Sequence, residues 1–117
     1  MHIYFSGIGG VGIGPLAMIA QDADYTVNGS DAHESEMTKG LQARGINIQI
    51  GQDGSQIELV HKQREIDWLV FSAALPDDHP ELVFAKNNGI RISKRADFLN
   101  HFLDEKNLQM IAIAGTH

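Results

Sequence analysis

The chain has 117 residues, 43% of them hydrophobic and 21% charged, with no cysteine and a formal net charge of −6. The acidic balance argues against a nucleic acid partner, which needs a basic surface to displace counterions, and the lack of cysteine excludes disulfides and thiolate metal sites. Because the sequence has no run of about 18 apolar residues and no basic start followed by an apolar stretch, we expect neither a membrane span nor a signal peptide.

The first predicted element is an apolar strand at residues 2–6, which leads into a glycine-rich loop and then a helix at residues 13–23. The loop fits the pattern G-x-G-x-x-G, and this order of elements is typical of a site that holds a phosphate with backbone amides. Its glycines carry an entropic cost that a plain turn does not require. The residues whose amides we expect to contact a phosphate are Gly9, Gly10, Val11 and Gly12.

The rest of the chain alternates short apolar runs with amphipathic ones. Ser35 is placed to cap a helix, and Gly45 and Gly89 are placed to end helices. Residues 55–65 fit either a short helix or an irregular link. The further predicted strands are residues 26–29, 46–50, 67–71, 90–93 and 109–114, and the further predicted helices are residues 35–45, 79–89 and 96–103.

This alternation predicts βαβ units, and hence a single α/β domain of Rossmann-like type with a mostly parallel sheet flanked by helices. Right-handed crossovers place the loops that follow the strands along one edge of such a sheet, where ligands bind. Besides the glycine loop, loops of this kind are predicted to begin at Ser30, Ser72 and Gly115.

Four side chains in or near these loops are candidates for ligand contact. Asp31 lies 19 positions after Gly12, just past the second predicted strand, where an acidic residue accepts hydrogen bonds from a ribose hydroxyl. Ser30 either shares that role or caps a turn. Ser72, after the most apolar predicted strand, is a candidate for contact with a phosphate or a sugar, and Arg95 is a candidate for contact with an anion or is an ordinary surface arginine.

The last residues carry a different signal. Gly115, Thr116 and His117 follow the last predicted strand directly, where a phosphate loop G-x-x-x-x-G-K-[ST] often begins. We therefore expect residues 1–112 to form the nucleotide-binding domain and residues 113–117 to be the incomplete start of an ATP loop that leads to a further domain. The six histidines include no pair at the i,i+4 spacing, so we expect no metal site from this chain alone.

In six segments, taken in order, the chain resembles the N-terminal domain of the Mur ligase family. The resemblance covers essentially the whole chain, and residues 113–117 resemble the start of the family's G-T-H-G-K-T ATP loop. One departure is the sequence Asp22-Ala23-Asp24, which stands where a glycine-ended helix is expected, so we expect that turn to close differently. The segments are GIGGVGIG at 7–14, GSD at 29–31, ESEMT at 34–38, SAALP at 72–76, HPEL at 79–82 and KRADFL at 94–99.

The resemblance implies a three-domain cytoplasmic ligase of peptidoglycan synthesis, which joins L-alanine to UDP-N-acetylmuramate with ATP and Mg²⁺ through an acyl-phosphate. Its first domain would hold the UDP part of the substrate. By motif, the amides of residues 9–12 would meet the diphosphate, Ser30 and Asp31 the uridine side, and Ser72 and Arg95 the diphosphate or sugar side. ATP and Mg²⁺ would belong to the intact enzyme, so we expect this chain alone to bind neither and not to catalyse.

Three alternatives stay open at this point. The glycine loop and Asp31 suit NAD as well as UDP, so one alternative is the NAD-binding Rossmann domain of an oxidoreductase or regulator. The murein-tripeptide recycling ligase shares the N-terminal layout, although the loop Ser72-Ala73-Ala74 favours the alanine-adding branch. The third alternative is a structural domain that binds no ligand.

Overall fold

The computed structural model describes residues 1–10, 12–72 and 75–105, with side chains described as far as Asn100. The strands are β1 (His2–Ser6), β2 (Thr26–Asp31), β3 (Asn47–Ile50), β4 (Trp68–Phe71) and β5 (Arg91–Lys94). The helices are α1 (Gly14–Asp22), α2 (Glu36–Ala43), α3 (Ser55–Gln63), α4 (Pro80–Asn87) and α5 (Arg95–Glu105). Strand and helix alternate as predicted, and the segment that fitted either a helix or a link is helical.

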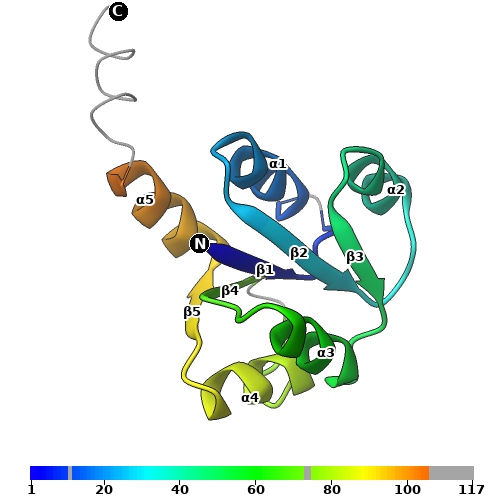
Figure 1. Ribbon diagram of the computed structural model, residues 1–117, viewed down its shortest axis with the longest axis vertical. Coiled ribbons are helices and arrows are strands. Elements are labelled where there is room, and N and C mark those ends of the chain that lie inside the picture. Colours follow the sequence, from blue (N-terminus) through cyan, green and yellow to red (C-terminus); the bar gives the residue numbers. More distant parts are fainter. Residues whose placement is uncertain (11, 73–74, 106–117) are drawn as a thin grey trace, which may run out of the picture.

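The five strands form one parallel sheet in the order β3-β2-β1-β4-β5. β1 is the central strand: the chain adds β2 and then β3 on one side of it, and then crosses to the other side, where it adds β4 and β5. Helices α1, α2 and α5 pack on one face and α3 and α4 on the other (Figure 1). The predicted α/β fold of Rossmann-like type, with a parallel sheet between helical layers, is confirmed.

The end of the second strand differs from the prediction. Ser30 and Asp31 are its last two residues and not the start of the following loop. Their pairing with Gln49 and Ile50 of β3 extends the strand, because tertiary pairing overrides the weak strand preference of a Gly-Ser-Asp sequence. The strand predicted at residues 109–114 and the ATP-loop start predicted at residues 113–117 lie outside the described residues.

Aromatic side chains attach α5 to the sheet. Phe5, Trp68 and Phe98 are fully buried, and the ring centroid of Phe98 lies 4.7 Å from that of Trp68 and 5.6 Å from that of Phe5, in edge-on geometry. The indole Nε1 of Trp68 also donates a hydrogen bond to Ser93 Oγ at 2.9 Å. These contacts fix the first turn of α5, and with it Arg95, relative to β1 and β4.

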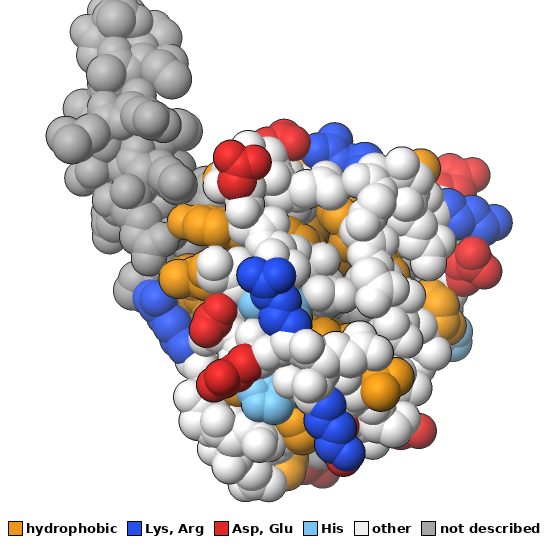
Figure 2. Space-filling view, viewed as in Figure 1, with side chains coloured by type: hydrophobic (Ala, Val, Ile, Leu, Met, Phe, Trp, Pro, Cys, Tyr) orange, Lys and Arg blue, Asp and Glu red, His pale blue; other side chains and the backbone are white. Residues whose placement is uncertain are grey.

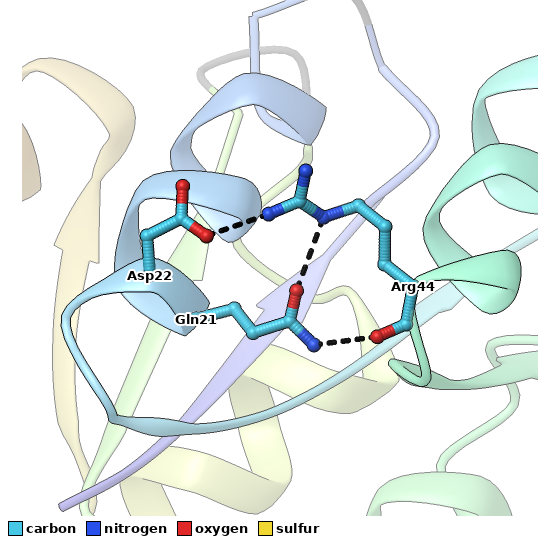
Figure 3. Close-up of polar contacts among 3 residues, drawn as sticks. All are labelled: Gln21, Asp22 and Arg44. Carbon is cyan, nitrogen blue, oxygen red and sulfur yellow. Dashed lines mark hydrogen bonds and ion pairs between the residues drawn. The ribbon is translucent and has the colours of Figure 1, made fainter.

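The C-terminal ends of α1 and α2 are joined at the surface. The guanidinium of Arg44 donates to Asp22 Oδ1 at 2.7 Å and to Gln21 Oε1 at 3.1 Å, and Gln21 Nε2 donates to the Arg44 carbonyl at 2.8 Å (Figure 3). The side chains of this ion pair are 37% and 71% exposed, so we expect it to contribute at most about 1 kcal/mol. It joins the C-terminal ends of these two helices at the surface.

Charged side chains of both signs occur on the face of the molecule drawn in Figure 2. Figure 2 shows acidic and basic side chains interspersed over this face, with hydrophobic side chains between them. In the part of the chain that the structure describes, no helix is both long and apolar enough to cross a membrane.

Helices α1, α2 and α4 end in the same backbone arrangement, in which the residue after the cap is left-handed. Gly45 and Gly89 fill that position after α2 and α4, with φ of 87° and 67°. After α1 the position is taken by Asp24, with φ of 70°. The amides of Asp24 and Tyr25 donate to the last turn at 2.9 and 3.1 Å, so the turn closes as a glycine-ended turn does, and the expectation that it closes differently was wrong.

His2 is buried at the start of β1. Its Nδ1 lies 3.1 and 3.2 Å from the carbonyl oxygens of Arg64 and Glu65, and its Nε2 lies 2.6 Å from Asn28 Nδ2. These partners require a neutral ring with the proton on Nδ1, because carbonyls accept and the Asn28 amide donates. Burial lowers the pKa of His2 from its usual 6.5, and the hydrogen bonds to the carbonyls oppose that shift only in part.

Replacing Asp24 by glycine is expected to stabilise the fold. A left-handed backbone costs an L residue roughly 1–2 kcal/mol, and the added freedom of glycine in the unfolded chain offsets about 0.5–1 kcal/mol of that. We therefore expect Asp24→Gly to raise the free energy of unfolding in urea by about 0.5–1 kcal/mol. Gly45→Asp is the reciprocal control, since a Cβ there meets nothing within 4 Å, and it is expected to destabilise. An unchanged or lowered stability of Asp24→Gly would contradict this account.

Acid is expected to destabilise the fold through His2. The unfolded chain takes up a proton near pH 6.5 while the folded His2, with its lowered pKa, resists it, so the free energy of unfolding falls as the pH drops below 6.5. This one group contributes a slope of at most about 1.4 kcal/mol per pH unit. In urea unfolding between about pH 7.5 and 5, His2→Gln should flatten the slope, and the exposed His33→Gln should not. Equal slopes in wild type and His2→Gln would refute the assignment.

Candidate functional site

The strand order places one candidate ligand crevice at the centre of the sheet. β1 and β4 are neighbours, but the chain leaves them in opposite directions, toward β2 and toward β5. In open parallel sheets, ligands bind at such a reversal, at the carboxyl ends of the strands. The register pairs Ser6 with Phe71, so the glycine loop after β1 and the loop after β4 begin next to each other at this edge.

The root of the glycine loop is held by the end of β2. The amides of Gly7 and Ile8 both donate to the Ser30 carbonyl, each at 2.9 Å, and Gly7 has a φ of 76°, a value that favours glycine. The Gly10 amide donates to the Gly7 carbonyl at 2.9 Å and closes the first turn. Because α1 begins at Gly14, the partially positive N-terminus of that helix lies at the same edge.

Asp31 contacts the glycine loop through its side chain. Its Oδ2 accepts a hydrogen bond from the Gly9 amide at 2.8 Å, and its Oδ1 accepts one from the His33 amide at 3.1 Å. An ionised carboxylate has about four acceptor positions, so Asp31 retains capacity for a hydroxyl donor. The predicted acidic residue is therefore at the loop, and it also shapes the loop.

Arg95 reaches the glycine loop from the start of α5, which packs on the same face of the sheet as α1. A Cβ built on Gly12 would lie 2.8 Å from Arg95 Cδ and 3.0 Å from its Nε, so the guanidinium covers Gly12 directly. Arg95 is exposed and begins α5. The Arg95 side chain therefore lies beside the loop, and its contact with an anion stays a prediction.

The other predicted site residues have mixed outcomes. Ser72 follows the last residue of β4 and is partly buried, at the edge where it was expected. Val11, residues 73 and 74, and the proposed ATP-loop residues Gly115, Thr116 and His117 lie outside the described residues. The structure therefore brings Gly9, Gly10, Gly12, Asp31, Ser72 and Arg95 to one edge of the sheet.

Ser30 differs from the expectation in what its hydroxyl contacts. The side chain is fully buried, and its Oγ donates to a carboxylate oxygen of Glu81 at 2.6 Å. The direct contact between this hydroxyl and a ligand stays a prediction.

Tyr4 also contacts Glu81. Burial and the neighbouring Glu81 carboxylate raise the pKa of Tyr4 far above its usual 10, so the phenol remains a donor to Glu81 at 2.8 Å.

Sequence reasoning missed the buried group around Glu81. The His-Pro-Glu sequence predicts a helix start, and an acidic residue there is usually solvated and favourable to the helix dipole. Burial of Glu81 depends on which strands lie beside α4, which no local pattern reveals. The missed residues are Tyr4, Ser6, Gln52 and Glu81.

Comparison with known proteins assigns the family. A family profile described as "Mur ligase family, catalytic domain" matches residues 2–107. This chain belongs to the Mur ligase family. The match extends over nearly all of the described residues of this Mur ligase chain, and the resemblance drawn from the six segments is confirmed.

Individual relatives agree with this assignment. The Mur ligase chain is 42% identical over 115 residues to UDP-N-acetylmuramate--L-alanine ligase of Clostridium novyi (strain NT), covering 98% of this chain and 24% of that protein. The structure of UDP-N-acetylmuramate-alanine ligase from Thermotoga maritima matches with a TM-score of 0.78 and 28% identity, over 90% of this chain and 23% of the other.

A second ligase, which has a peptide in its name, matches almost as well in structure. UDP-N-acetylmuramate:L-alanyl-gamma-D-glutamyl-meso-diaminopimelate ligase from Neisseria meningitides has a TM-score of 0.74 and 29% identity, over 86% of this chain and 30% of that one. Of the Clostridium novyi alanine ligase described above, the chain spans about a quarter of the length.

Proposed function

We propose that this domain binds the UDP part of UDP-N-acetylmuramate and belongs to a ligase that adds L-alanine to that substrate. The observation that carries the proposal is the guanidinium of Arg95 over Gly12, which sets a cation beside the N-terminus of α1. Such a pair favours a group with several negative oxygens, as in a diphosphate. The three relatives above all have UDP-N-acetylmuramate in their names, which supports this choice of ligand.

The ligand is proposed to lie along the carboxyl edge of the sheet. The amides of Gly10, Val11 and Gly12 and the Arg95 side chain hold the diphosphate, and the Gly9 amide joins them by exchanging its Asp31 partner. Ser72, at the head of the adjacent loop, contacts the diphosphate or the sugar.

The uridine side is proposed to lie over the end of β2. Asp31 accepts hydrogen bonds from the ribose there, because its carboxylate has about four acceptor positions and, once the Gly9 amide has changed partner, keeps only the His33 amide. Ser30 lies on the same side and holds the loop through its carbonyl.

Catalysis is proposed to need parts of the protein beyond this chain. The described residues contain no group of three or more His, Cys, Asp or Glu side chains that would hold a metal ion. ATP, Mg²⁺ and L-alanine are assigned to the remainder of a ligase that works in the cytoplasm. On this proposal the chain alone binds its nucleotide-sugar substrate and does not ligate.

A second candidate is the domain of a murein-tripeptide recycling ligase, because the structural match to the Neisseria meningitides enzyme is nearly as good as that to the alanine-adding enzyme. The names of both enzymes share UDP-N-acetylmuramate, so the two candidates make the same proposal for the ligand of this domain. The two candidates differ in the amino component that is joined to this ligand, which is L-alanine in one name and a peptide in the other. An activity assay of the intact protein with each amino component would distinguish them.

Calorimetry with the 117-residue chain tests the proposed ligand. UDP-N-acetylmuramate and UDP are expected to bind, UMP to bind more weakly because it lacks the second phosphate, and NADH to give no heat. Arg95→Gln should weaken UDP more than UMP, since it removes a cation placed at the diphosphate. Tight binding of NADH without a response to UDP or UDP-N-acetylmuramate would replace the proposal with the NAD-binding alternative, and no response to any nucleotide would favour a structural domain.

Replacing Gly12 tests the position of the diphosphate. Gly12→Val adds a side chain where the phosphate is proposed to approach, and the three described atoms nearest its Cβ all belong to the exposed side chain of Arg95. We expect at least a tenfold loss of UDP-N-acetylmuramate affinity, about 1.4 kcal/mol, with a Tm within a few degrees of wild type. Gly40→Val, in α2, is the matched control, since a Cβ there meets nothing within 4 Å. Unchanged affinity of Gly12→Val would count against the loop as the site.

A further inference from the structure

A buried carboxylate ties together the ends of the two central strands. Glu81, in the first turn of α4, is fully buried. Its Oε1 accepts hydrogen bonds from the hydroxyls of Ser6 and Ser30, each at 2.6 Å, and its Oε2 accepts one from Tyr4 at 2.8 Å. The donors come from β1 and β2, whereas the carboxylate comes from a helix on the face opposite α1.

Gln52 extends this group to the third strand. Its Nε2 lies 3.1 Å from Ser30 Oγ, 3.3 Å from Ser6 Oγ and 3.4 Å from Glu81 Oε1. Gln52 follows β3, so the group joins the carboxyl ends of three adjacent strands. We refer to Glu81, Ser6, Ser30 and Gln52 as the Glu81 cluster.

The charge of Glu81 is met by hydrogen-bond donors. The two ion pairs found among the described residues lie elsewhere, at Arg44 and at Lys62, so hydroxyl and amide donors and the N-terminus of α4 surround this carboxylate. Burying a carboxylate is costly, and an apolar side chain of similar volume often stabilises a core as well or better. Packing alone therefore gives no reason for a carboxylate here, whereas fixing several hydroxyls in place does.

The Glu81 cluster is directly connected to the glycine loop. Ser6 is the residue before Gly7, and the carbonyl of Ser30 accepts the hydrogen bonds of the Gly7 and Ile8 amides. Glu81 therefore holds both roots of the loop, one through the end of β1 and one through the end of β2. A shift of either serine moves the loop amides.

We propose that Glu81 is a positioning residue for the nucleotide site, which sets the place of the glycine-loop amides by holding the hydroxyls of Ser6 and Ser30. The ligand in this inference rests on the proposed function. The effect on the loop itself depends on no ligand, so it can be measured whether or not UDP binds.

The test compares Ser6→Ala and Glu81→Leu with Ser93→Ala. Ser6 carries no proposed ligand contact, so its loss acts only through the cluster. Ser93→Ala makes the same chemical change at another buried serine, whose hydroxyl accepts from Trp68 at 2.9 Å. The readouts are hydrogen exchange of the Gly7 and Ile8 amides by NMR and the Kd for UDP by calorimetry, both at a temperature at which each variant is folded.

In Ser6→Ala, we expect the Gly7 and Ile8 amides to exchange at least fivefold faster and the Kd for UDP to rise at least fivefold. We expect neither change in Ser93→Ala. If Glu81→Leu does not fold, Ser6→Ala alone decides the result. Wild-type exchange and affinity in Ser6→Ala would overturn the positioning role, as would equal losses in Ser93→Ala. If wild type binds no UDP, the proposed function fails, and faster exchange in Ser6→Ala alone would still support the role of Glu81 at the loop.

Discussion

The root of the glycine loop is held by one carbonyl group, that of Ser30, which accepts hydrogen bonds from the amides of Gly7 and Ile8. That contact requires β2 to lie parallel to β1 with Ser6 opposite Ser30. It also requires close approach of the two strands at Gly29, where a Cβ would lie 2.7 Å from the Phe5 carbonyl oxygen. The position of the glycine loop thus depends on the pairing of β1 with β2, and that pairing depends on the absence of a Cβ at Gly29.

The two helical layers have different parts in this arrangement. Arg95, at the start of α5, approaches the loop from the layer that also holds α1 and α2. Glu81 holds the strand ends from the opposite layer, through hydroxyl groups that no solvent reaches. The positive charge of Arg95 therefore lies beside Gly12 on one side of the loop. On the buried side, the strand ends that carry the loop are held by neutral hydroxyl donors around the Glu81 carboxylate. Membership of the Mur ligase family fits a domain that presents such a loop to a nucleotide.

Much of this architecture was predictable from the sequence, because apolar periodicity and glycine positions mark the strands, the helices and the edge that binds ligands. The Ser35 cap is an example, since its hydroxyl accepts the Thr38 amide. The end of β2 and the burial of Glu81 were not predictable, because both depend on which strands become neighbours. Asp24 shows a third case, in which a sequence without the expected glycine still reaches the left-handed backbone of a helix end. Local patterns therefore predicted the elements and the edge of the sheet, whereas tertiary contacts decided which side chains lie at the glycine loop and which are buried beneath it.

The carboxylate of Asp31 at the Gly9 amide has a consequence for ligand selection. It places negative charge at the end of β2, while Arg95 places positive charge at Gly12, so the two ends of the loop differ in sign. A nucleotide whose phosphates all lie on the 5′ side matches this polarity in one orientation only. If the ribose lies at Asp31 as proposed, a further phosphate on its 2′ or 3′ oxygen would meet that carboxylate and be repelled. On that proposed placement, the side chain that shapes the loop would also select against nucleotides phosphorylated at the 2′ or 3′ position.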